Sequence, residues 1–174
     1  YILYSEYFNP YLNQKSNIFD TIQTLAKYKD IEKANSNRLF MLGFTLWKRY
    51  FIRPFFKAKD NKIIFLNSLK SLARYKLKEN DKFFIWGKRI DYNALKTTLI
   101  KKAQDENLLH FIPKISLVED GFIRSISLGS DLTRPFSLNV DDKGLYIDPN
   151  KASKLEELLQ NEIFDENMLN RNCL

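Results

Sequence analysis

The fold class of this chain is decided by three consecutive segments, "KFFIWG" (82–87), "DYNALKTTLIKKAQDEN" (91–107) and "KISLV" (114–118). The first and third are short apolar runs typical of buried strands. The middle segment begins with Asp91, a good helix N-cap, and has apolar residues on one helical face. These residues are Leu95, Leu99 and Ala103. A strand, a helix and a strand joined by short connections predict a βαβ unit with parallel strands.

The same alternation extends upstream. "RLFMLGF" (38–44) predicts a buried strand closed by Gly43, and "KIIFL" (62–66) predicts another. "TLWKRYFIRPFFK" (45–57) predicts a helix that Pro54 interrupts or ends. Three further elements are predicted: a helix over 67–78, a helix over 17–34 and a linker over 1–15. The helix over 17–34 has Ser16 as its N-cap, and its apolar face consists of Ile18, Ile22, Leu25 and Ala26. We therefore expect an α/β domain over 16–174, with a mostly parallel sheet and flanking helices.

Two further elements are expected after the parallel strands. "FSLNVDDKGLYID" (136–148) predicts a β-hairpin with Asp142, Lys143 and Gly144 at its turn. "NKASKLEELLQNEI" predicts a closing helix, in which Ser153 and the glutamate three residues later form a capping box.

Composition excludes several classes of protein. The chain has 174 residues, 44% of them hydrophobic, and is globular in composition. One cysteine, Cys173, and one histidine, His110, exclude an intramolecular disulfide, a cysteine metal cluster and a multi-histidine zinc or haem site, so we predict no metal. We also expect no cofactor. No apolar run is long enough to span a bilayer, and the start does not resemble a signal peptide. Because the first residue is Tyr1, we expect a piece of a longer chain. The net charge of +7 favours anionic partners.

The main candidate site is the stretch "LVEDGFIRS" (117–125), where Glu119 and Asp120 follow a predicted strand. Ligands of open α/β sheets bind beyond the carboxyl ends of the strands, so a carboxylate there is positioned to act as a base or nucleophile. Adjacent residues diverge, so the two are not expected to share a proton. Gly121 permits a sharp turn. An exposed acidic turn explains the same residues, and spacing alone leaves both interpretations open.

Other stretches also carry two interpretations. The loop "RSISLGSDLTRP" (124–135) lacks both nucleotide-binding glycine motifs, and is either a cradle for a sugar or carboxylate or an ordinary connection. Trp86 and Gly87 end a strand, and either pack in the core or border the site. The basic and aromatic stretch 47–57 has three interpretations. The favoured one is an amphipathic helix with its aromatics in the core; the second is a surface that contacts a membrane, and the least favoured is a contact with nucleic acid. His110 receives no role.

Several of these segments together resemble the KpsC-type capsule polysaccharide proteins, which are bacterial β-Kdo glycosyltransferases. The resemblance rests on "IWGKR" (85–89), "LVEDGFIRSISLGSDL" (117–132), "PFSLNVDDKGLYID" (135–148) and "SKLEELL" (153–159). Upstream, "YSEYFNPYLNQ" and "MLGFTLWKRYFIRPFF" resemble the segment that opens the second of the family's two transferase modules. The resemblance covers nearly the whole chain, and the run from Glu119 to Asp148 is its most specific part.

The resemblance implies a Rossmann-like domain that forms one half of a GT-B glycosyltransferase module. It implies retaining transfer of Kdo from CMP-β-Kdo to a poly-Kdo linker on phosphatidylglycerol, by a protein on the cytoplasmic side of the inner membrane. Asp120 is then the catalytic carboxylate, as nucleophile or base, and Glu119 its partner. The substrate-binding residues expected around them are Gly121, Arg124, Ser125, Gly129, Ser130, Trp86 and Gly87.

Two departures from the family pattern affect this expectation. Ser127 stands where relatives often have Gly, and the chain has no His-Pro pair, the motif that helps bind the CMP phosphate in the family. We therefore expect the acceptor-side half of a module, inactive alone, with a glycolipid acceptor and capsule assembly machinery as partners. The alternative is a non-catalytic module that binds lipid-linked sugar during export. A nucleic-acid-binding domain is the weakest alternative, and no nucleic-acid partner is expected.

Overall fold

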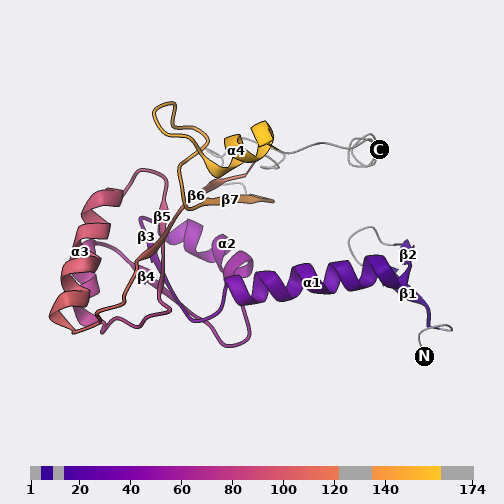
Figure 1. Cartoon of the computed structure of the whole chain (residues 1–174), viewed down its shortest axis with the longest axis horizontal. Helices are drawn as coiled ribbons and strands as arrows, with labels where there is room; N and C mark the ends of the chain where they lie inside the picture. Colours follow the sequence, from indigo (N-terminus) through magenta and orange to yellow (C-terminus); the bar gives the residue numbers. More distant parts are fainter. Residues whose placement is uncertain (1–4, 10–13, 122–134, 162–174) are drawn as a thin grey trace.

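A five-stranded sheet forms the centre of the protein (Figure 1). The computed structural model describes residues 5–9, 14–121 and 135–161. The strand order is β4-β3-β5-β6-β7, and the first four strands are parallel while β7 runs antiparallel to β6. The bounds are β3 (Arg38–Leu42), β4 (Lys62–Leu66), β5 (Lys82–Trp86), β6 (Lys114–Asp120) and β7 (Leu138–Asp141). The predicted α/β class with a mostly parallel sheet is confirmed.

Helices cover both faces of the sheet, which explains why its strands are continuous apolar runs (Figure 1). Helix α2 (Leu46–Phe56) lies on one face, whereas α3 (Tyr92–Asp105) and the short 3₁₀ helix η1 (Leu69–Arg74) lie on the other. Successive residues of a strand point to opposite faces. In β3, Leu39 and Met41 therefore join the α2 core, while Phe40 and Leu42 join the α3 core.

Helix α3 forms as its sequence predicts. The Asp91 carboxylate accepts a hydrogen bond from the Ala94 amide at 2.6 Å, which satisfies one of the free N–H groups of the first turn. The three apolar residues of its inner face, Leu95, Leu99 and Ala103, are buried. Local capping and helical periodicity therefore suffice to specify this element.

Two other helices depart from expectation. Helix α2 continues two residues past Pro54, because a proline near a helix end removes only one intrahelical hydrogen bond. The helix predicted over 67–78 is reduced to the six residues of η1. Ser68 makes no side-chain capping bond there, and the backbone at Tyr75 is already extended. The segment therefore lacks the caps that would lengthen it.

Helix α1 (Ile18–Ala34) extends away from the sheet, and none of its residues is buried (Figure 1). Its N-cap is Asn17 rather than the predicted Ser16, since the Asn17 side chain accepts a 2.9 Å hydrogen bond from the amide of Asp20. The apolar residues share one face of the helix, as predicted, but this face is exposed to solvent; Leu25, for example, is 61% exposed. At its far end lies an antiparallel ribbon made of β1 (Tyr7–Asn9) and β2 (Gln14–Ser16).

The hairpin predicted over 136–148 is wrong. β7 pairs with β6 instead of with the residues that follow it, and no strand follows β7 within the described residues. The buried carboxylate of Asp141 decides this, because its Oδ1 atom accepts hydrogen bonds from the amides of Lys143 (2.8 Å) and Gly144 (3.2 Å). Such an Asx turn bends the chain before a second strand can form.

The same aspartate connects the turn to the closing helix. Asp141 Oδ2 accepts a 2.7 Å hydrogen bond from the amide of Lys154, the first residue of α4 (Lys154–Asn161). The predicted capping box is confirmed: the Ser153 amide donates to Glu156 at 2.7 Å, and the Glu156 amide donates to Ser153 Oγ at 3.2 Å. Helix α4 is therefore fixed to the end of β7.

Candidate functional site

The topology of the sheet identifies one edge as the place for a ligand. The chain leaves β3 through α2 on one face, and it leaves the neighbouring β5 through α3 on the other. In open α/β sheets, ligands bind at the carboxyl ends of two strands whose connections diverge in this way. The candidate site therefore lies beyond the carboxyl ends of β3 and β5, and β6 ends beside it.

Glu119 and Asp120 lie within β6, not after it as predicted from the sequence. Pairing with β7 prolongs the strand, because Glu119 pairs with Asn139 and Asp120 with Leu138. The tertiary pairing therefore places both carboxylates on a regular strand, where neighbouring side chains point to opposite faces. The expected divergence of the two side chains follows from this geometry.

The carboxylate of Asp120 is paired with a lysine from α2. The Nζ atom of Lys48 lies 3.6 Å from Asp120 Oδ2, and both side chains are largely sheltered, at 18% and 17% exposed. The same ammonium lies 3.5 Å from the ring centroid of Trp86, a cation–π contact. Trp86 is buried, as its core-packing interpretation predicted, and the Lys48 ammonium lies over its ring. Lys48, Trp86 and Asp120 thus form one cluster from three elements.

The ionisation of Lys48 reflects its position. Burial lowers its pKa below the ordinary lysine value, and the positive charge of Arg89 acts in the same direction. The negative charges of Asp120 and Glu119 oppose this shift but do not cancel it. Since removing an ammonium from water disfavours its charged form, the cluster is a poorly hydrated environment in which charge interactions are strong.

The backbone around Asp120 is held from two sides. The Tyr146 hydroxyl donates a 2.9 Å hydrogen bond to the backbone oxygen of Asp120, and the Gly121 amide donates to the backbone oxygen of Ser137 at 2.9 Å. A Cβ atom on Gly121 would lie 2.9 Å from the carbonyl carbon of Ser137. Gly121 is therefore required by the close approach of another backbone segment.

Gly87 brings the turn after β5 against Glu119. Its φ of +54° is in the left-handed region, and a Cβ atom added there would overlap the Glu119 Oε1 atom. Its amide also donates a 2.9 Å hydrogen bond to the backbone oxygen of Val118. Trp86 and Gly87 are predicted substrate-binding residues, and both lie beside the two carboxylates.

We expect Gly87→Ala to destabilise the 174-residue chain by about 1–2 kcal/mol, because alanine is strained in the left-handed region and its methyl group displaces Glu119. Urea unfolding followed by tryptophan fluorescence measures this change. The double variant Gly87→Ala/Glu119→Ala should recover the steric part of the loss but not the backbone part. Equal stability of Gly87→Ala and the parent chain would contradict this account.

Four predicted substrate-binding residues lie outside the described residues. They are Arg124, Ser125, Gly129 and Ser130. Their role as a cradle for substrate stays a prediction. Among the residues that are described, no group of three or more potential metal-binding side chains occurs.

The basic and aromatic stretch 47–57 divides between core and surface. Ile52 and Phe56 are buried on the sheet, as the amphipathic interpretation predicts. The expectation that its aromatics enter the core is wrong for Tyr50, which is 76% exposed, and Leu46 beside it is 80% exposed. Both residues lie in the first two turns of α2, which begins near the carboxyl end of β3. Contact with a membrane stays a prediction, and no helix in the described parts of the chain is long and apolar enough to cross a bilayer.

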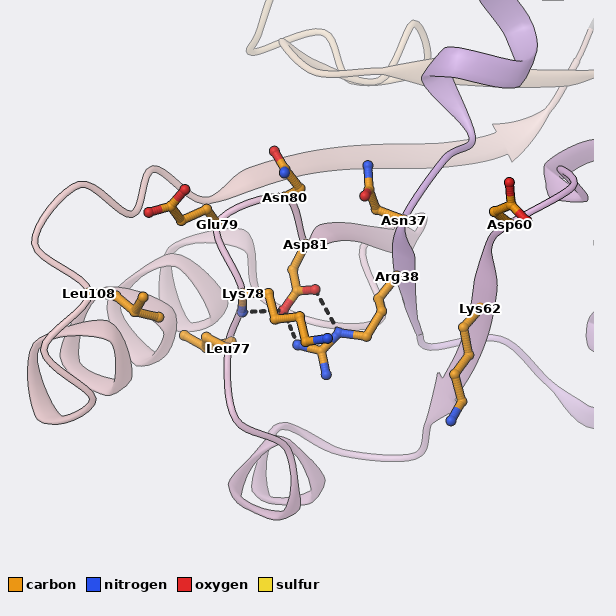
Figure 2. Close-up of a pocket in the computed structure, with 10 residues that line it drawn as sticks. All are labelled: Asn37, Arg38, Asp60, Lys62, Leu77, Lys78, Glu79, Asn80, Asp81 and Leu108. Carbon is orange, nitrogen blue, oxygen red and sulfur yellow. Dashed lines mark hydrogen bonds and ion pairs between the residues drawn. The ribbon is translucent and has the colours of Figure 1, made fainter.

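A cavity of about 610 Å³ lies at the opposite edge of the sheet (Figure 2). Its lining includes an ion pair that stabilises the fold. There Asp81 points toward Arg38 and is joined to it by hydrogen bonds of 2.8 Å from Nε and 2.6 Å from Nη2. Asp81 is 1% exposed and also accepts a 2.8 Å hydrogen bond from the Lys78 amide. This cavity borders the amino ends of β3, β4 and β5, opposite the carboxyl ends where ligands of this fold class bind.

Comparison with known proteins identifies the family. The model of the family described as "Capsule polysaccharide biosynthesis protein" matches residues 84–172, which include the whole Glu119–Gly121 corner. The chain belongs to this family. The KpsC-type resemblance derived from the sequence is thereby confirmed at the level of the family.

Several relatives are similar over most of the chain. The capsule polysaccharide modification protein LipA of Neisseria meningitidis is 36% identical over 166 residues, which are 95% of this chain and 22% of LipA. The lipopolysaccharide-processing protein LpsZ of Rhizobium meliloti is 30% identical over 70% of this chain and 26% of its own. The chain therefore spans about a quarter or less of these curated relatives.

Among solved structures, the chain is similar to Thermosulfurimonas dismutans KpsC, a beta Kdo 2,7 transferase. The sequence identity is 29%, the match covers 77% of this chain and 38% of the other, and the TM-score is 0.45.

Three basic residues at this edge of the sheet were not singled out from the sequence: Lys48, which pairs with Asp120, and Arg49 and Arg89, which line a cavity there. The available signal was position: the first two begin the helix after β3, and the third follows β5 by three residues. In a parallel sheet, residues just beyond the carboxyl ends of central strands meet at one edge. The amphipathic interpretation treats residues 47–57 as one unit, whereas Lys48 in the first turn of this helix reaches the site.

Proposed function

We propose that this family member is a glycosyltransferase of capsule polysaccharide synthesis that transfers Kdo, an acidic keto sugar, to a lipid-linked acceptor. The chain supplies the acceptor-side half of the module and the catalytic carboxylate, Asp120. The observation that carries the proposal is the sheltered Asp120 carboxylate at the ligand-binding edge of the sheet, 3.6 Å from Lys48 Nζ. Membership of the capsule polysaccharide biosynthesis family supports the reaction class.

Asp120 has two possible roles in a retaining transfer. As a nucleophile it attacks the anomeric carbon of the donor, CMP leaves, and an acceptor hydroxyl then displaces the carboxylate with a second inversion. As a base it removes the proton from the acceptor hydroxyl, which must then attack the anomeric carbon from the same face that CMP leaves, because a single back-side displacement would invert that centre. In both roles the carboxylate must be oriented, and the ion pair with Lys48 holds it in position. Glu119, on the neighbouring position of the strand, is proposed to hold substrate or backbone groups.

We place the site for the donor, CMP-β-Kdo, largely in a part of the longer protein that this chain does not contain. The share of the curated relatives that the chain spans, 22% of LipA, is consistent with this division. The acceptor is proposed to be a poly-Kdo linker on phosphatidylglycerol at the cytoplasmic face of the inner membrane. Exposed Leu46 and Tyr50 on α2 are suited to face the lipid end of such an acceptor.

The test uses the full-length protein with CMP-β-Kdo and a synthetic Kdo-terminated acceptor. We expect release of CMP together with an acceptor extended by one β-linked Kdo, identified by mass spectrometry and by NMR of the anomeric centre. A CMP-linked sialic acid serves as the control donor and should give no extension. Binding of the acceptor without CMP release would instead support the non-catalytic, export-associated module and would overturn the transferase proposal.

A further inference from the structure

A separate cavity of about 280 Å³ lies at the point where the connections of β3 and β5 diverge. It is bordered by the turn after β3, the first turn of α2, the end of β4 and the turn after β5. The polar residues that line it are Thr45, Arg49, Asn67 and Arg89. Among the described residues that line it none is acidic, so the cavity carries two positive charges and no balancing carboxylate of its own.

Arg49 is held in place by hydrogen bonds that leave part of its guanidinium available. Its Nε atom donates to the backbone oxygen of Phe44 at 3.0 Å, and Nη2 donates to Oδ1 of Asn67. Its guanidinium carbon also lies 5.3 Å from the ring centroid of Phe65. These bonds use two of the five N–H donors of an arginine. A donor group oriented in advance loses little conformational freedom when it binds an anion.

Arg89 approaches the same cavity from the other strand. Its amide donates to the backbone oxygen of Trp86 at 3.2 Å, which closes the turn after β5. A Cβ atom on Gly43 would lie 3.0 Å from the Cβ atom of Arg89, so its side chain starts against the end of β3. Within the described part of the chain, neither Arg89 nor Arg49 forms a salt bridge with a carboxylate.

The cavity and the carboxylate corner are electrostatically connected. The charge of Arg89 contributes to lowering the pKa of Lys48, after the larger effect of burial. β6, which carries Asp120, is the next strand to β5, and neighbouring strands are about 4.8 Å apart. Arg89, in the turn after β5, therefore lies on the side of the cavity nearest to the strand that carries Asp120.

We propose that the cavity between Arg49 and Arg89 binds an oxyanion, a carboxylate or a phosphate, of the acidic acceptor, and so directs the acceptor hydroxyl toward Asp120. The proposal rests on the proposed function, because it names the group of the acceptor that the site recognises. Guanidinium groups bind both kinds of oxyanion with paired N–H bonds, and an anionic acceptor offers carboxylates along its sugars and a phosphate at its lipid end.

The test compares Arg89→Ala and Arg89→Lys in the full-length protein, with Arg74→Ala as the matched control. Arg74 is also an exposed arginine, but it ends η1 and does not line this cavity. We expect Arg89→Ala to raise the acceptor KM roughly tenfold to a hundredfold with kcat changed by less than about threefold, since a charge-assisted hydrogen bond is lost. Arg89→Lys should recover part of the loss, and Arg74→Ala should change neither constant. An unchanged acceptor KM in Arg89→Ala would overturn the proposal.

Two ligands distinguish the source of the oxyanion. The first is a lipid-free acceptor of two Kdo residues whose carboxyl groups are reduced to alcohols. It should bind more weakly than the unreduced acceptor if the carboxylate is recognised. Glycerol phosphate should compete with the acceptor if the lipid phosphate is recognised. Either result supports the site and assigns its ligand. Equal affinity for the reduced acceptor together with no competition by glycerol phosphate overturns it.

Binding is also measured by calorimetry in Asp120→Asn full-length protein, where no turnover is required. Loss of acceptor binding on adding Arg89→Ala to this variant supports the oxyanion site even if the parent protein transfers no sugar. In that case the proposed function fails and the site stands. If instead the parent protein transfers Kdo and Arg89→Ala leaves acceptor binding unchanged, the proposed function stands and the oxyanion site is overturned.

Discussion

Asp120→Asn in the full-length protein is expected to reduce Kdo transfer by at least about 10²- to 10⁴-fold, the range typical of losing a positioned acid or base. Asparagine has nearly the same shape but neither attacks an anomeric carbon efficiently nor accepts a proton at neutral pH. The main effect should fall on kcat, because the substitution leaves the arginines of the proposed oxyanion cavity in place. Initial rates of CMP release and circular dichroism measure activity and folding in the same preparation.

Asp142→Asn is the matched control for this experiment. Asp142 is exposed and follows the end of β7, whereas the ion pair with Lys48 is made by Asp120, so replacing Asp142 should leave turnover unchanged. Turnover of Asp120→Asn within about threefold of the parent, in a folded protein, would sink the catalytic assignment. A Kdo adduct on a peptide containing Asp120, found by mass spectrometry, would select the nucleophile over the base.

Asp81→Ala is expected to lower the free energy of unfolding by about 3–5 kcal/mol. The replacement leaves the guanidinium of Arg38, whose side chain is 20% exposed, without its carboxylate at the amino edge of the sheet (Figure 2). It also leaves the Lys78 amide without its acceptor. Because the whole stability of a domain is of the order of 5–15 kcal/mol, this change removes a large share of it.

Urea unfolding of the 174-residue chain followed by tryptophan fluorescence measures the effect, since Trp86 is buried in the folded state. Asp60→Ala is the matched control: Asp60 lines the same cavity but is exposed, and its loss should change stability by less than about 0.5 kcal/mol. The double variant Arg38→Met/Asp81→Ala should be more stable than Asp81→Ala, because no charge is left uncompensated. Similar stability of Asp81→Ala and Asp60→Ala would refute this account.

Much of the fold follows from local sequence. Helix α3 is specified by Asp91 and by its apolar spacing, and α4 by the Ser153–Glu156 capping box. Both signals act within one or two helical turns, so no distant residue is needed to interpret them. The strands from β3 to β6 are recognisable for a similar reason, since a parallel sheet covered on both faces requires continuous apolar runs.

The errors occur where distant contacts override the local pattern. The predicted hairpin after residue 135 has a good turn sequence, but the buried Asp141 carboxylate accepts hydrogen bonds from an amide within that turn and from the first amide of α4. Helix α1 has apolar spacing, but the residues of its apolar face stay largely exposed, Ile22 at 56% and Leu25 at 61%. The spacing of apolar residues along a helix shows which of them share a face, but it does not show what packs against that face.

By itself the sequence determined the α/β class, the order of the elements and the presence of two carboxylates near the end of a strand. The tertiary structure alone decided that β7 prolongs this strand through Asp120, and that Lys48 reaches Asp120 across Trp86. It also decided that Arg49 and Arg89 line one cavity. The physical reason is that periodicity and capping act over a few residues, whereas these contacts join residues that are distant in the chain and meet only when the strands are ordered in the sheet.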